Sequence, residues 1–410
     1  MKIKELLRKN LVLIVLFSLL INLMLVLQVL GAEQEDVSLP ANPLEGRKVF
    51  TNKGCGKCHT VWGQGMTFGP DLAIISKGKS MLQLAGLLWN HSPRMVEIME
   101  EKGLTRPNFT PKEMSLLMAY LYYLNYFDQP GDFTRGERVF KDKACINCHS
   151  LGGTGGKVGP QLDKYQRYMS SISFAQAMWN HGPKILKKMA EMGIKWPHFK
   201  GSEVNDFLAY IRGIGTSDET VEKVYLFSGN PKKGAKLFEG KGCLECHSVK
   251  GKGGKIGPDL AEVSAPGSAS EMAGRMWNHG PEMWENMARR GIPLPELSAE
   301  EMADIISFVY FTFYMDKGGD PVKGKEYFAK KGCLSCHGLG KIGKRVGPDL
   351  SDSEAISSPV HLASAMWNHA PVMEKMFEEQ NLPWPRFDGD EMRDLVEYIR
   401  SFGKGAKEAN

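Results

Sequence analysis

Residues 55–59 read Cys-Gly-Lys-Cys-His, and this short stretch returns three more times in the 410-residue chain. The other copies of Cys-x-x-Cys-His stand at residues 145–149, 243–247 and 333–337. Together the copies use all eight cysteines, namely Cys55, Cys58, Cys145, Cys148, Cys243, Cys246, Cys333 and Cys336. The pattern is typical of covalent haem attachment, in which both thiols add to the haem vinyl groups as thioethers.

The histidine that ends each copy is a candidate iron ligand, because it presents a ring nitrogen from the same short turn. One copy alone could belong to a zinc site or a thioredoxin-like redox pair. Four copies with no cysteine left over argue against both, so the sequence predicts four covalent haem c groups. The predicted ligands on this side of the iron are His59, His149, His247 and His337.

The chain repeats one unit around each motif, since the four motif histidines are 90, 98 and 90 residues apart. Three further features keep this register, which indicates internal repeats. Gly-x-x-x-Phe or a close variant opens the units at Gly46, Gly136, Gly234 and Gly324. Gly-Pro-x-Leu follows at Gly69, Gly159, Gly257 and Gly347. Trp-Asn-His-x-Pro comes next, at Trp89, Trp179, Trp277 and Trp367.

Apolar residues recur at helical spacing and strand patterns are scarce, so the sequence predicts an all-α fold of four tandem domains. Capping-box patterns place helix starts after Thr110 and Ser298. The expected domains are residues 40–127, 132–214, 229–316 and 320–403.

Two duplicated dihaem halves are favoured by a constant offset of 188 residues, which relates Tyr122 and Asp128 to Tyr310 and Asp316. The linker between the halves is expected within residues 213–232.

The N-terminus indicates export. Basic residues precede an apolar run in residues 1–31, which we interpret as a signal peptide or a retained membrane anchor. Either reading places the protein in the periplasm or elsewhere outside the cytoplasm. The net charge of +5 is small, and about three of these charges belong to the N-terminal segment, so no nucleic-acid surface is indicated.

The four units resemble the class I cytochrome c family. The resemblance rests on the opening helix, Cys-x-x-Cys-His, Gly-Pro-x-Leu and a closing helix with an inner aromatic residue, over residues 40–403. It implies a small helical domain around each haem. It also implies that one proline carbonyl per domain orients the haem-binding histidine; these prolines are Pro70, Pro160, Pro258 and Pro348.

The chain departs from this family at the far side of the iron. The family usually places a methionine before a proline ahead of the last helix; here the matching residues are Arg106, Trp196, Leu294 and Trp384. A histidine column 32 residues after each motif never fails, and we expect it to supply the sixth ligand: His91, His181, His279 and His369. Methionine columns on the same segment each fail once, yet methionine ligation in some units and an open iron remain alternatives.

The resulting functional expectation is an electron carrier of a respiratory chain, with no catalytic residues of its own and with unidentified donor and acceptor proteins as partners. One alternative is a multihaem oxidoreductase in which one open haem acts on a small inorganic substrate. Another is a haem-bearing subunit of a membrane complex or filament, for which the N-terminus would provide membrane association.

Overall fold

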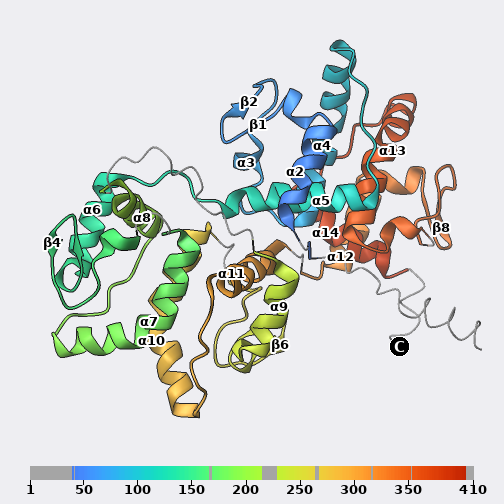
Figure 1. Ribbon diagram of the computed structural model, residues 1–410. Coiled ribbons are helices and arrows are strands. Elements are labelled where there is room, and N and C mark those ends of the chain that lie inside the picture. The colour runs from blue at the N-terminus through green and yellow to red at the C-terminus, as the bar shows by residue number, and fades with distance from the viewer. Residues whose placement is uncertain are drawn as a thin grey trace, which may run out of the picture. The chain divides into compact units, whose positions relative to one another are not determined.

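The computed structural model describes residues 39–40, 42–165, 169–214, 229–263, 267–314, 317–351 and 353–402 (Figure 1). The expected export segment, residues 1–31, and most of the expected linker at 213–232 lie outside these ranges. Every helix within the ranges is too short or too polar to span a bilayer.

Four elements recur in the same order in every domain: an opening helix, a 3₁₀ turn at the haem motif, a long helix and a closing helix. The first domain contains η1 (Pro43–Glu45), α2 (Gly46–Asn52), η2 (Cys55–Lys57), α3 (Leu72–Ile75), α4 (Met81–Glu101), α5 (Pro111–Tyr123) and η3 (Leu124–Tyr126). The second contains α6 (Phe133–Asp142), η4 (Cys145–Asn147), η5 (Leu162–Tyr165), α7 (Ser171–Glu191) and α8 (Glu203–Gly213). The third contains α9 (Pro231–Gly240), η6 (Cys243–Glu245), α10 (Ala269–Arg290) and α11 (Ala299–Tyr314). The fourth contains α12 (Pro321–Lys330), η7 (Cys333–Ser335), η8 (Glu354–Ile356), α13 (Pro359–Glu379) and α14 (Glu391–Arg400).

Each haem motif is followed by an antiparallel hairpin of two very short strands. The pairs are β1 (Thr60–Val61) with β2 (Gln64–Gly65), β3 (Ser150–Leu151) with β4 (Thr154–Gly155), β5 (Ser248–Val249) with β6 (Lys252–Gly253), and β7 (Gly338–Leu339) with β8 (Ile342–Gly343). The described residues are otherwise helical or irregular, which confirms the predicted all-α class.

The opening and closing helices of each domain cross in close contact: α2 with α5, α6 with α8, α9 with α11, and α12 with α14. The opening glycine makes this possible. A Cβ atom on Gly234 would collide with the Asp304 carbonyl group and the Phe308 side chain, and the other three opening glycines meet their closing helices in the same way. The closing helices begin where the capping boxes predict, at Pro111 and Ala299.

One lysine per domain ties the haem-motif turn to the closing helix. Lys53 donates to the Asn108 carbonyl oxygen at 2.7 Å and forms an ion pair with Glu113, the capping-box residue of α5, at 2.8 Å. The equivalent ion pairs are Lys143–Glu203, Lys241–Glu301 and Lys331–Glu391. Each haem motif is therefore held against the start of the last helix of its own domain.

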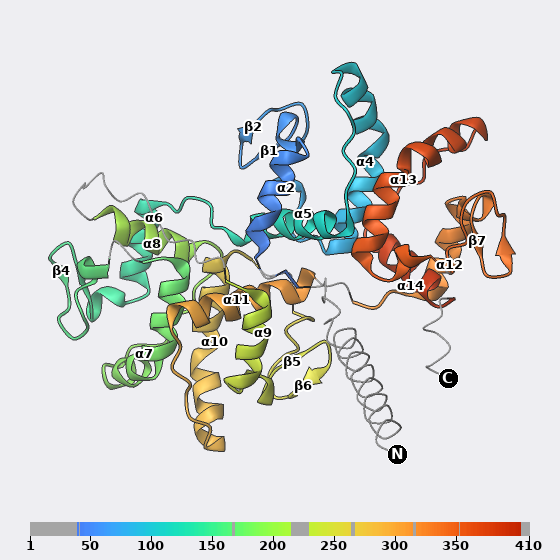
Figure 2. The same ribbon diagram turned by 45° about the vertical axis from the view of Figure 1, so that its right-hand side comes forward.

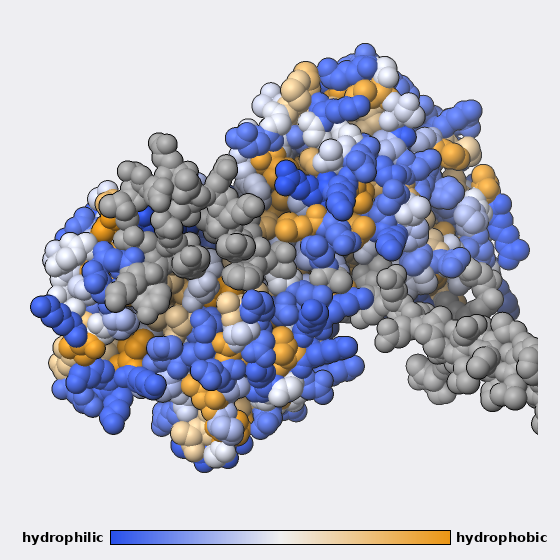
Figure 3. All heavy atoms as spheres, in the orientation of Figure 1, coloured by the Kyte–Doolittle hydropathy of each residue, from blue (hydrophilic) through white to orange (hydrophobic). Residues whose placement is uncertain are grey.

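The long helices also join different domains, as Figure 2 shows: α4 lies beside α13, and α7 beside α10. The first domain is thus paired with the fourth and the second with the third. Contacts between α5 and α11 join the pairs. Tyr122 and Tyr310 are both buried, and each hydroxyl donates to the backbone carbonyl of the other, at 2.7 and 2.9 Å. Polar residues cover most of the face shown in Figure 3, and its hydrophobic patches are small and scattered.

Candidate haem-binding site

The two cysteines and the histidine of each motif lie on one 3₁₀ turn. In the first domain, the backbone N–H of His59 donates to the Cys55 carbonyl oxygen at 3.0 Å, and the N–H of Cys58 donates to the same oxygen at 3.2 Å. The same pair of bonds occurs in all four domains. The turn therefore presents both sulfur atoms and the imidazole within five consecutive residues, as attachment to one haem requires.

The proximal histidines have fixed tautomers. In each, Nδ1 lies 2.8 to 3.1 Å from a proline carbonyl oxygen: His59 with Pro70, His149 with Pro160, His247 with Pro258, and His337 with Pro348. Because a carbonyl oxygen only accepts, Nδ1 must carry the proton. The Nε2 lone pair is then free to bind a metal, and the hydrogen bond fixes the orientation of the ring.

The glycine before each proline packs directly against this ring. A Cβ atom on Gly69 would collide with the His59 imidazole, and the glycines at 159, 257 and 347 meet their histidines in the same way. Gly-Pro is therefore a support for the histidine as well as a turn.

Burial keeps the first cysteine of each motif protonated at neutral pH. Burial raises the pKa of the Cys55, Cys243 and Cys333 thiols to about 11 and that of Cys145 to about 12. Oxidation proceeds through the thiolate, so a raised pKa makes these thiols less reactive toward oxidants. The buried thiol, the nearby second cysteine and the oriented histidine together fit a covalently bound haem.

The residues at the family's usual methionine position serve a different purpose, because three of the four contact a tryptophan of the paired domain. The ring of Trp196 stacks on Trp277 with 3.8 Å between centroids, and Trp384 stacks on Trp89 at 4.2 Å. The Arg106 guanidinium lies 3.8 Å from the Trp367 ring centroid. Burial lowers the pKa of Arg106 to about 10. These positions dock domains.

The tryptophan and asparagine of Trp-Asn-His-x-Pro supply the other side of this docking contact. Each indole N–H donates to the proline carbonyl of the paired domain: Trp89 to Pro385, Trp179 to Pro295, Trp277 to Pro197, and Trp367 to Pro107. Each asparagine exchanges two hydrogen bonds with the backbone of one residue: Asn90 with Phe387, Asn180 with Leu297, Asn278 with Phe199, and Asn368 with Phe109.

The proline of this motif explains a third contact. A proline inside a helix leaves the carbonyl four residues earlier without its helical donor, and in this motif that carbonyl belongs to the tryptophan. The residues at the family's usual methionine position supply the missing donor to these carbonyl oxygens. Trp384 donates to the Trp89 oxygen, Trp196 to the Trp277 oxygen, and Arg106 to the Trp367 oxygen. The sequence repeats revealed the motif but not this role. One sequence signal could have indicated it: at the family's usual methionine position, three of the four domains have a residue with a side-chain hydrogen-bond donor.

The four predicted distal histidines are exposed on the long helices. In two of them the ring is bonded to the preceding helical turn: Nδ1 of His91 to the Leu87 oxygen at 2.8 Å, and Nδ1 of His279 to the Arg275 oxygen at 2.9 Å. Their role as ligands therefore stays a prediction from spacing.

Comparison with known proteins agrees with the geometry. A family model described as Cytochrome c matches four stretches, residues 44–125, 133–215, 231–310 and 321–403. Among curated proteins, cytochrome c oxidase subunit 2 of Alkalihalophilus pseudofirmus is 27% identical over 86 residues, which are 20% of this chain and only 25% of that protein. No solved structure matches the chain. Because the four matches cover most of its length, the chain belongs to the cytochrome c family as four tandem domains.

Proposed function

We propose that this protein is an exported tetrahaem c-type cytochrome that carries electrons between redox partners of a respiratory chain. Family membership implies haem-based electron transfer, and the four cysteine pairs fit four covalent haem c groups. The observation that carries the proposal is the equality of the four sites. All four have the same motif turn and the same histidine-to-proline hydrogen bond. Four alike sites suit a carrier, whereas an enzyme usually modifies one copy to open a haem.

The respiratory assignment draws on the matched relative, whose name describes an oxidase subunit. Location outside the cytoplasm draws on the basic and apolar pattern of residues 1–31. Donor and acceptor are proposed to be separate redox proteins, and the N-terminal segment is proposed as the site of any membrane association.

The domain contacts suggest the route of the electrons. Electron transfer weakens steeply with distance, so domains in contact exchange electrons fastest. The contacts run from the second domain to the third, from the third to the first through Tyr122 and Tyr310, and from the first to the fourth. We infer that electrons follow this order rather than the order of domains in the sequence.

Carbon monoxide tests the carrier function on the purified holoprotein. A carrier with both axial positions filled is expected to show four reversibly reducible haems and no fast carbon monoxide binding. Fast binding to one haem in four would instead indicate the oxidoreductase.

Flash reduction by less than one electron per molecule tests the route. Equilibration among haems is expected to slow in N278A, which loses the contact between the second and third domains, and to be unchanged in N286A. Equal rates of equilibration among the haems in both variants would contradict the proposed order of electron transfer.

A further inference from the structure

We propose that Asp71 and Asp259 are positioning residues for the haem-binding histidines of the first and third domains. Each aspartate directly follows the proline whose carbonyl oxygen accepts from the histidine, and its carboxylate binds the hydroxyl of the residue after the same histidine. The inference rests on the proposed haem function and adds a determinant of the reduction potential. It also divides the four haems into two kinds, because within the described residues the other two domains lack this arrangement.

In the first domain, two hydrogen bonds join the haem motif to the Gly-Pro segment. Oγ1 of Thr60 donates to Oδ2 of Asp71 at 3.1 Å, and Nδ1 of His59 donates to the Pro70 oxygen at 2.9 Å. Thr60 directly follows His59, and Asp71 directly follows Pro70. Two hydrogen bonds and two peptide links therefore form one closed set of contacts, which we call the carboxylate bridge. The histidine cannot move away from the proline without straining both hydrogen bonds.

The third domain has the same bridge with serine in place of threonine. Oγ of Ser248 donates to Oδ2 of Asp259 at 3.0 Å, and Nδ1 of His247 donates to the Pro258 oxygen at 3.1 Å. Ser248 and Thr60 are both buried, so water has little access to the hydroxyl that completes each bridge. The bridge therefore occurs twice, in the domains that the offset of 188 residues relates to each other.

Backbone N–H groups hold each carboxylate from the other side, one from the hairpin turn after the haem motif and one from the chain after Gly-Pro. The donors are Gly63 and Ala73 for Asp71, at 2.6 and 2.8 Å, and Gly251 and Ala261 for Asp259, at 2.6 and 2.9 Å. Burial alone would raise the pKa of both aspartates, but the hydrogen bonds that they accept lower it below the ordinary value. Both are therefore charged acceptors at neutral pH, and charged acceptors form the stronger hydrogen bonds.

The second domain lacks the bridge among the residues that the structure describes. Gln161 stands at the position of the aspartate. Asp163, two residues later, accepts from the Gly152 N–H of the hairpin turn at 2.8 Å. In this part of the chain neither side chain binds the hydroxyl of Ser150, the residue after His149. The hydrogen bond from this histidine to its proline is therefore not supported by a second one.

The fourth domain keeps the aspartate but not the hydroxyl. Gly338 follows His337 and has no side chain to donate. Asp349 accepts instead from Oγ of Ser351, two residues further on, at 2.7 Å, and from the N–H groups of Gly340 and Ser351. The carboxylate therefore reaches the hairpin turn, while the side-chain bond to the residue after the histidine is missing.

The bridge acts on the iron through the imidazole. A hydrogen bond from Nδ1 to a carbonyl oxygen makes the ring a more basic ligand, which favours ferric iron and lowers the reduction potential. The bridge keeps that hydrogen bond in place, and its negative charge acts in the same direction. We therefore expect the bridge to lower the potentials of the first and third haems.

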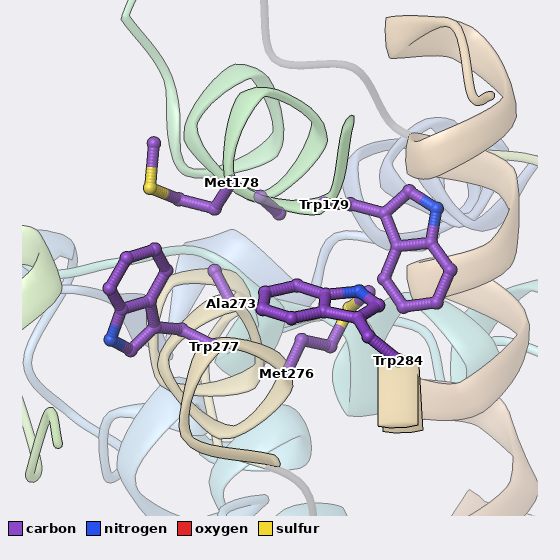
Figure 4. A pocket seen from close by; sticks show the side chains of 7 residues that line it. Met178, Trp179, Ala273, Met276, Trp277 and Trp284 are labelled. Carbon is purple, nitrogen blue, oxygen red and sulfur yellow. The ribbon is translucent and has the colours of Figure 1, made fainter. Parts of the chain in front are cut away.

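The two bridged domains occupy the middle of the proposed route. The second and third domains meet where α7 packs on α10, and there Trp179, Trp277 and Trp284 line a hollow (Figure 4). Tyr122 and Tyr310 then join the third domain to the first. Lower potentials at these central haems favour electrons on the haems of the second and fourth domains, which end the proposed route.

The test removes one hydroxyl without changing any charge, in the reduced full-length holoprotein. S248A is expected to accelerate exchange of the His247 Nδ1 proton by about tenfold or more, because a hydrogen bond to a charged group is lost, and to raise the potential of the third haem. S150A changes the same position of the second domain and is expected to alter neither quantity at the second haem. S248T copies the threonine of the first domain and is expected to match the wild type. Nuclear magnetic resonance follows both the proton and the redox titration of each haem.

Unchanged exchange and potential in S248A would overturn the proposal, as would equal effects of S248A and S150A. Faster exchange with an unchanged potential would contradict the positioning role, and so would S248T behaving like S248A. If S248A fails to bind its third haem, T60V in the first domain decides by the same two measurements on His59 and the first haem. A wild-type protein with fewer than four reducible haems would refute the proposed function itself, whereas four haems that S248A and T60V leave unaltered would refute the bridge alone.

Discussion

The asparagine that joins the second and third domains offers a direct test of domain docking. Nδ2 of Asn278 donates to the Phe199 carbonyl oxygen at 2.8 Å, and the Phe199 N–H donates to Oδ1 of Asn278 at 2.7 Å. Phe199 is 7% exposed, so few water molecules can replace a lost partner. The substitution N278A removes both bonds and leaves two buried backbone groups of Phe199 unpaired.

The cost follows from these two groups. Each unsatisfied buried backbone group costs about 1 to 3 kcal/mol, so N278A should weaken docking by about 2 to 6 kcal/mol. Since 1.4 kcal/mol corresponds to a factor of ten, the undocked population should rise by about 30-fold or more.

The control is N286A on the same helix, two turns further along. Within the part of the chain that the structure describes, Asn286 bonds only within α10, donating to the Glu282 carbonyl oxygen and accepting from Arg289. Its removal exposes no group of the second domain, so we expect docking in N286A to match that of the wild type.

Hydrogen exchange of the Trp277 indole N–H provides the assay. This proton is bonded to the Pro197 oxygen at 2.7 Å, and neither substitution alters either residue. Its exchange should accelerate by about 30-fold or more in N278A, in line with the docking penalty, and stay unchanged in N286A. The reasoning fails if both variants exchange this proton at the same rate.

Three further predictions concern the helices, the motif turn and alkaline pH. G234A should lower unfolding free energy by about 1 to 3 kcal/mol or more through overpacking, while G240A, which meets open space on the same helix, should raise it by up to about 1 kcal/mol; similar urea midpoints would contradict this. A144G should raise the free energy of unfolding by about 1 kcal/mol, because Ala144 has a φ of 60° where the other motifs have glycine. A melting temperature below that of the wild type would refute this. Burial raises the pKa of Tyr122 and Tyr310 well above 10, so stability should be complete below pH 10 and fall by about 1.4 kcal/mol per pH unit per tyrosine above it; denaturation curves that do not change across pH 10 would exclude this.

The sequence alone predicts the parts of this protein that depend on local chemistry. The haem motifs, the helical class and the helix starts at Thr110 and Ser298 follow from spacing and capping, because each involves residues within a few turns of one another. The repeats also identify four equivalent units. Local patterns suffice wherever the interacting residues are near in sequence.

Pairing of domains could not be predicted in this way. The contact between Trp89 and Pro385 spans almost 300 residues, and a sequence that repeats one unit four times does not say which copies touch. An order following the chain would place the first domain beside the second, whereas the long helices pair the first with the fourth. Arg106 and Trp384 occupy equivalent positions but use different chemistry, a cation over a ring and stacked rings, so no single residue type marks the interface.

The docking contacts also explain why the usual ligand position is lost. In α10, Trp277 and Asn278 reach the second domain, and Pro281 leaves the Trp277 carbonyl oxygen available to Trp196 of that domain. A loop residue that must stack on the neighbouring domain cannot also bind the iron of its own domain. The two roles therefore have to be divided along the chain, with docking assigned to the loop and to the middle of the long helix. The residues that follow α7 and α13 contact their own haem motifs, since Met192 lies 3.7 Å from the Cys148 sulfur and Gln380 lies 3.6 Å from the Cys336 sulfur, so on these two helices one rigid element carries both the domain contact and the motif contact.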